Sequence, residues 1–154
     1  MRLRHDWRIA IVLGAAVSTA RVVSSIAAAP NQVSATGTIW SGVFSADQAK
    51  RGEVSASSKC AKCHGADLAG GQDGPSLVGP DVLQAWSGMT VGDLFDRVKT
   101  TMPADAPRSL SPQETADVVA YLFSLNKCPA GEKEMASEME ALGQIRITTR
   151  DASR

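Results

Sequence analysis

The sequence has few aromatic residues, few histidines and no excess of charge of either sign. Aromatic residues make up 5% of the 154 positions, and the chain has two histidines and three cysteines. The 16 basic residues balance 16 acidic ones, which excludes the strongly basic surface of a dedicated nucleic-acid-binding protein. The apolar fraction of 44% and the length are those of a single globular domain. Because so few aromatic residues supply little apolar mass to a core, a bound prosthetic group would be a suitable source of it.

Long hydrophobic runs are also absent, and the apolar stretch that does occur predicts a signal peptide over residues 1–29. A basic segment, 1–8, precedes an apolar run, 9–20, and small residues follow at 27–29. The run is shorter than the ~20 residues that a transmembrane helix needs, although an uncleaved N-terminal anchor is the alternative. We therefore expect a periplasmic or secreted protein with no stable membrane insertion after signal removal.

Two of the three cysteines lie in the sequence Cys60-Ala61-Lys62-Cys63-His64. This spacing is typical of covalent c-type haem attachment. Two thiols on one tight turn can add to the two vinyl groups at one porphyrin edge, and the histidine that follows then faces the iron. Such a histidine binds as neutral imidazole, and its other ring nitrogen donates to a nearby acceptor.

Three other interpretations of the cysteine pair compete with haem attachment. A thioredoxin-like redox pair would need a βαβ pattern around it, which is missing. A zinc site needs four ligands, and Cys128 lies far along the chain from the other nitrogen and sulfur donors. A structural disulfide between Cys60 and Cys63 is the simplest alternative.

The second axial ligand is expected to be a methionine, because His64 is the only histidine beyond the predicted signal peptide. Met102 is the strongest candidate, since Pro103 and Pro107 stiffen the loop that follows it. The other methionines, which precede a helix or lie on one and are expected to pack, are Met89, Met135 and Met139.

Helix signals frame this motif and predict a small all-α domain of three to five helices. Ser45, Thr90 and Ser111 are each suited to cap a helix start, and Ser111 is followed by Pro112 and Glu114 as in a capping box. The expected elements are helices over 45–58, from 90 onward, 111–126 and within 132–143, a loop over 65–80, and a short strand or tail over 144–149. The domain is expected at 45–127, with extensions at 30–44 and 128–154.

These features together resemble a class I monohaem cytochrome c over residues 40–125. The resemblance rests on the haem motif, Gly74-Pro75-Ser76-Leu77, Met102-Pro103 and Ala120-Tyr121-Leu122. Within this family, the sequence is similar to the cytochrome domains that accompany bacterial quinoprotein dehydrogenases. It implies a cytochrome c fold around one covalently bound haem c. Its implied roles are thioether attachment for Cys60 and Cys63, axial iron ligands for His64 and Met102, an acceptor for the imidazole at the Pro75 carbonyl, and a close helix crossing at Gly52 near Tyr121.

Two positions depart from the family pattern. Ala56 stands where the family usually has an aromatic residue, which leaves a looser helix crossing or a place filled by Phe123. Cys128 has no counterpart, so it is either a buried thiol or part of a disulfide between chains.

Three further side chains are candidates to donate hydrogen bonds to the haem propionates, with ordinary packing as the alternative. They are Trp86, Arg97 and Arg108, whose indole and guanidinium groups donate well to carboxylates.

The expected function is electron transfer by a carrier that is not itself an enzyme. It would accept electrons from a dehydrogenase, for example a quinoprotein dehydrogenase, and pass them to an oxidase. The alternative is a haem subunit of a dehydrogenase complex, or a gas-binding haem protein with a labile sixth ligand.

Overall fold

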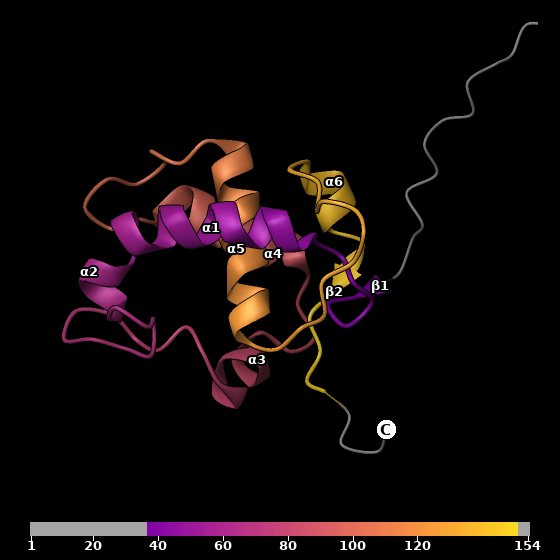
Figure 1. Ribbon diagram of the computed structural model, residues 1–154, viewed down its shortest axis with the longest axis horizontal. Helices are drawn as coiled ribbons and strands as arrows, with labels where there is room; N and C mark the ends of the chain where they lie inside the picture. The colour runs from indigo at the N-terminus through magenta and orange to yellow at the C-terminus, as the bar shows by residue number, and fades with distance from the viewer. Residues whose placement is uncertain (1–36, 151–154) are drawn as a thin grey trace, which may run out of the picture. The chain divides into compact units, whose positions relative to one another are not determined.

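A computed structural model describes residues 37–150, so the predicted signal peptide lies outside the described residues. The elements in order are β1 (Gly37–Thr38), α1 (Ala46–Lys59), α2 (Ala61–His64), α3 (Pro80–Trp86), α4 (Val91–Thr101), α5 (Pro112–Leu125), α6 (Met139–Leu142) and β2 (Ile145–Arg146) (Figure 1). The predicted all-α class is confirmed. The described part has six helices rather than three to five, because α2 and α6 are single turns of four residues each.

The three long helices begin where capping residues predicted them. The Ser45 hydroxyl accepts a hydrogen bond from the backbone of Gln48, and Thr90 and Ser111 each form a complete capping box. These side chains satisfy backbone N–H groups that a helix start leaves without a partner.

Helices α1 and α5 cross closely at Gly52, as the resemblance implies (Figure 1). A Cβ atom at Gly52 would overlap the carbonyl of Asp117 and lie 2.8 Å from Cβ of Tyr121. Only glycine therefore allows this approach of the two helices.

Phe123 does not fill the place beside Ala56, contrary to one expectation. Ala56 packs with Val118 and Leu122, which lie four residues apart on one face of α5. Phe123 points to a different face and packs against Phe44 in the main core, with ring centroids 6.4 Å apart.

The segments on either side of 45–127 pack on the helices and on each other. Strands β1 and β2 pair in parallel, and the Trp40 indole N–H donates to the carbonyl of Thr148 at 2.9 Å. Ile147 is fully buried, and its N–H donates to the carbonyl of Met89 at 2.9 Å. The C-terminal segment thus shares the main core with the helices.

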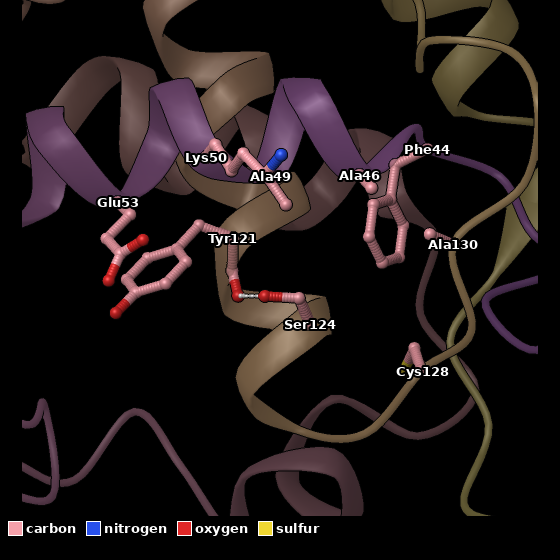
Figure 2. A pocket seen from close by; sticks show the side chains of 9 residues that line it. All are labelled: Phe44, Ala46, Ala49, Lys50, Glu53, Tyr121, Ser124, Cys128 and Ala130. Carbon is pink, nitrogen blue, oxygen red and sulfur yellow. Dashed lines mark hydrogen bonds between the residues drawn. The ribbon is translucent and has the colours of Figure 1, made fainter.

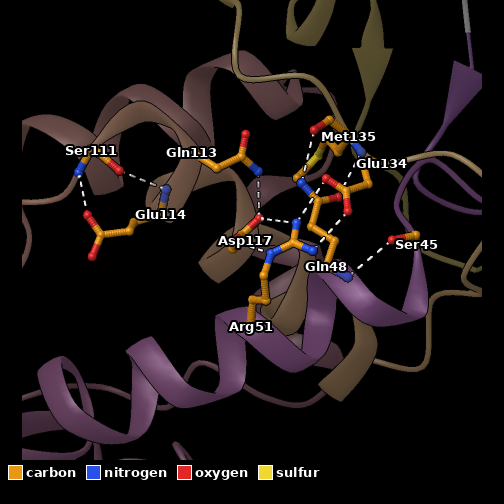
Figure 3. A network of polar contacts seen from close by, with 9 residues as sticks. All are labelled: Ser45, Gln48, Arg51, Ser111, Gln113, Glu114, Asp117, Glu134 and Met135. Atoms are coloured by element: carbon orange, nitrogen blue, oxygen red, sulfur yellow. Dashed lines mark hydrogen bonds and ion pairs between the residues drawn. The ribbon is translucent and has the colours of Figure 1, made fainter.

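The predicted helix within 132–143 is shorter than expected, since only Met139–Leu142 is helical. Met135 instead lies in a loop, where its backbone N–H and C=O both bond to the buried Gln48 side chain (Figure 3). Nearby, Arg51 bridges the carboxylates of Asp117 and Glu134. These tertiary bonds satisfy polar groups that a longer helix would have used.

Between residues 37 and 150, no helix combines the length and the apolar character needed to cross a membrane.

Candidate haem site

A cavity of about 730 Å³ lies between α2, the segment 73–79, α3, the end of α4 and α5. Its volume is within the usual range for cofactor sites, ~300–1,000 Å³. The sequence-predicted residues that line it are Cys60, Cys63, His64, Pro75, Trp86, Arg97 and Met102. The fold therefore brings seven of the eight candidates, spread over 43 positions from Cys60 to Met102, to one cavity.

His64 is fixed in orientation by a backbone acceptor. It is 8% exposed, and its Nδ1 lies 2.7 Å from the carbonyl oxygen of Pro75. A carbonyl only accepts, so Nδ1 carries a proton, and in the neutral imidazole the lone pair that can bind a metal is then on Nε2. Gly74 packs against the ring, because a Cβ atom there would lie 2.8 Å from Nδ1.

Cys60 and Cys63 both line the cavity half-buried, and neither forms a disulfide in the described part of the chain. Burial raises the pKa of the Cys60 thiol. Residues 37–150 contain no group of three or more His, Cys, Asp or Glu side chains arranged to hold a metal ion.

Met102 is the only methionine among residues 37–150 that lines the cavity. It follows the last turn of α4, where its N–H donates to the carbonyl of Val98 at 3.0 Å. Met135 is buried in the main core, whereas Met89 and Met139 are 41% and 48% exposed. The geometry therefore separates Met102 from its three competitors.

Trp86 and Arg97 border the cavity, but Arg108 does not. Arg108 is exposed in a turn with a φ of 66°, and its carbonyl accepts a hydrogen bond from Lys99. The structure thus does not bring Arg108 to the place where the sequence analysis expected it.

Helix α3 supplies one wall of the cavity, and the sequence analysis predicted no helix there: the expected loop ends at Pro80, where α3 begins. Val82, Ala85 and Trp86 of this helix all line the cavity. The missed signal is the pair Gly79-Pro80, since proline is favoured in the first turn of a helix.

The two lysines at the rim of the cavity are paired within the domain. Lys59 Nζ lies 2.8 Å from the Glu114 carboxylate, and Lys62 Nζ lies 3.3 Å from that of Asp105. The Lys59 ammonium and the backbone of Ser111 lower the pKa of Glu114 to about 2. The pairs connect the residue before the haem motif to α5, and the middle residue of the motif to the loop that follows α4.

The donor set fits a covalently attached haem. Two thiols and an imidazole with its Nε2 lone pair available come from one turn of chain, and a thioether comes from another part of the same cavity. Much of the remaining wall is apolar, with Leu94, Val98, Val118 and Leu122 among its residues.

One comparison with known proteins, the match to a family model, agrees with this assignment. A model of the family described as cytochrome C oxidase, cbb3-type, subunit III, matches residues 47–122. No curated relative matches the sequence. Among solved structures, the sulfane dehydrogenase SoxCD from Paracoccus pantotrophus is similar at 21% identity and a TM-score of 0.48, covering 73% of this chain and 60% of that chain.

The match covers the haem motif, Pro75 and Met102, which the fold gathers around one cavity. The chain therefore carries a class I c-type cytochrome domain, whose covalently bound haem c serves in electron transfer.

Proposed function

We propose that the chain is an exported one-electron carrier whose haem iron lies between His64 and Met102, and that it is not itself an enzyme. The observation that carries this proposal is that Met102 and His64 line the same cavity as Cys60 and Cys63, whereas the other described methionines lie elsewhere. An iron that both His64 and Met102 held would have no open position for a substrate.

The residues of the cavity have separate tasks in this function. Haem, when bound, supplies an iron that alternates between the Fe(II) and Fe(III) states. The Pro75 carbonyl keeps the proton of His64 on Nδ1 and the ring in one orientation. A thioether at Met102 favours a higher reduction potential than a second imidazole would, and the apolar walls keep water away.

The proposed partners are a dehydrogenase that donates electrons, of the quinoprotein class that the sequence resemblance suggests, and an oxidase that accepts them. The family match supports the second, since that family is described as an oxidase subunit. Redox encounters of this kind use small interfaces, so neither partner requires a permanent complex.

Optical spectroscopy tests the ligation directly. The holoprotein is matured in a host that attaches haem c, and its spectra are recorded oxidised, reduced and as the pyridine haemochrome. We expect a c-type haemochrome and a weak long-wavelength band from the iron–thioether bond. That band should vanish in Met102→Ala and persist in Met139→Ala, which changes an exposed methionine. A wild-type protein that binds carbon monoxide readily when reduced would overturn the proposal.

The proposed location is the periplasm, and its support is the signal-peptide pattern in residues 1–29. Fractionation of cells that express the full chain should place the haem protein in the periplasm. A version without residues 1–29 should stay in the cytoplasm and lack covalent haem. Haem-loaded full-length protein in the cytoplasm would contradict the proposal.

A haem subunit of a larger oxidoreductase complex is the second candidate, because the matching family is described as a subunit. Mild extraction followed by size-exclusion chromatography separates the two. A stable complex with a large enzyme favours the subunit, and a haem peak no larger than the 16.1 kDa of the full chain favours the diffusing carrier.

A further inference from the structure

The loop that supplies the acceptor for His64 is held by a side chain outside the cavity. This loop, residues 75–79, begins with the Pro75 carbonyl that faces Nδ1 of His64. It ends at Gly79, which directly precedes α3. The position of the loop therefore determines both the proximal hydrogen bond and the start of one cavity wall.

Asn126, the C-terminal capping residue of α5, contacts this loop at two points. Its Oδ1 accepts a hydrogen bond from the N–H of Gly79 at 2.9 Å, and its Nδ2 donates to the carbonyl of Leu77 at 3.0 Å. Nδ2 also donates to the carbonyl of Leu122 at 2.8 Å, within α5 itself. Asn126 is 8% exposed, so water does not readily replace these bonds.

The chemistry of the contact suits asparagine. The loop presents one donor and one acceptor two residues apart, and an amide side chain offers both. Aspartate has no donor for Leu77, and alanine has neither group. A second tie, from the N–H of Leu77 to the carbonyl of Leu68 at 2.8 Å, holds the loop from the opposite side.

We propose that Asn126 is a positioning residue for the haem: by clamping the loop 75–79 to the end of α5, it holds the Pro75 carbonyl against His64 and so sets the strength of the proximal hydrogen bond. The inference rests on the proposed function for His64 as an iron ligand, but not on Met102. A stronger hydrogen bond at Nδ1 makes an imidazole a more basic ligand and stabilises the oxidised iron. Loosening the clamp therefore raises the reduction potential.

The test compares Asn126→Ala with Ser124→Ala in the holoprotein. Ser124 is a matched control, since its hydroxyl donates to the carbonyl of Tyr121 at 2.8 Å in the last turn of α5 and forms no hydrogen bond with the loop. Two quantities are measured in each protein: the hydrogen-exchange rate of the His64 Nδ1–H, followed by NMR in the reduced state, and the reduction potential.

We expect Nδ1–H exchange to be roughly tenfold faster in Asn126→Ala, because two hydrogen bonds that restrain the loop are lost, and the potential to rise. Ser124→Ala should leave both unchanged, because it removes a hydrogen bond within α5 and none to the loop. Asn126→Ser, which keeps a shorter polar group, should fall between wild type and alanine, and it serves as the test if Asn126→Ala does not fold.

Equal exchange rates in Asn126→Ala and wild type would overturn the proposal, and so would equal effects of Asn126→Ala and Ser124→Ala. Failure of the proposed function is seen separately. If the iron–thioether band is absent from the wild-type protein, the assignment of Met102 is wrong, while the exchange of the His64 proton still reports on the clamp.

Discussion

The buried pair between Gln48 and Met135 offers the sharpest test of how the C-terminal segment is held. Gln48 is 0% exposed, and Met135 is 3% exposed. The amide of Gln48 accepts from the N–H of Met135 at 2.7 Å and donates to its carbonyl at 2.9 Å. One side chain thus satisfies both backbone groups of a residue 87 positions away.

The change Gln48→Met removes these two bonds while it keeps the length and nearly the volume of the side chain. Both backbone groups of Met135 then stay buried without partners, at about 1–3 kcal/mol each. The apolar side chain is easier to bury than the amide and offsets part of this cost. We therefore expect the free energy of unfolding to fall by about 2–4 kcal/mol.

Urea unfolding of the holoprotein, followed by far-ultraviolet circular dichroism, measures this loss. With a slope of about 2 kcal/mol per molar, the midpoint should fall by about 1–2 M. The control is Gln84→Met, the same chemical change at an exposed position of α3, which should alter the free energy of unfolding by less than about 0.5 kcal/mol. If the two variants unfold at the same urea concentration, the pair does not stabilise the segment and the reasoning is refuted.

Three further predictions follow from the helix crossing, an ion pair and a buried thiol. Gly52→Ala should lower the free energy of unfolding by about 1–3 kcal/mol, because the added Cβ meets the Asp117 carbonyl, even though alanine has the better helix propensity. The control Ser57→Ala, on the exposed face of α1, should not lower it. Equal unfolding midpoints for the two variants would contradict this prediction. The pKa of Glu114 is lowered to about 2 from an ordinary 4.5, so the group contributes stability above pH 4.5 that is lost as the pH falls toward 2. In Glu114→Gln, the free energy of unfolding should therefore fall less steeply over that pH range. An acid titration curve equal to that of the wild type would show that the pair with Lys59 contributes nothing. Burial raises the pKa of Cys128 to about 12, which leaves about one thiolate in ten thousand at pH 8. Iodoacetamide should therefore label Cys128 only after unfolding. Rapid labelling of the folded protein would refute its burial, and no labelling after unfolding would indicate a disulfide between chains.

The local features of the fold could be predicted because they depend on neighbours in the sequence. A capping side chain bonds to a backbone group three residues away, so Ser45, Thr90 and Ser111 indicate helix starts whatever the rest of the chain does. The haem motif is equally local, since Cys60, Cys63 and His64 fall on one turn. The missed helix α3 had a local signal as well, in Gly79-Pro80.

Other features depend on groups that are distant along the chain. The segment 132–143 has a helical pattern of apolar residues, but the backbone of Met135 bonds to Gln48 and Glu134 pairs with Arg51, both on α1 (Figure 3). Cys128 is likewise buried by packing in the main core beside α1 and α5, at the edge of a small pocket (Figure 2). No pattern within either segment reveals these partners.

By itself, the sequence determined the chemistry of the site, because residue types and their spacing decide which thiols, imidazole and thioether are available. Only the tertiary structure decided which of four methionines lines the same cavity as His64, that Arg108 lies away from this cavity, and that Asn126 forms hydrogen bonds with the loop that follows Pro75. The physical reason is that a ligand or hydrogen-bond partner is selected by position in space, and chain folding brings together groups that the sequence keeps tens of residues apart.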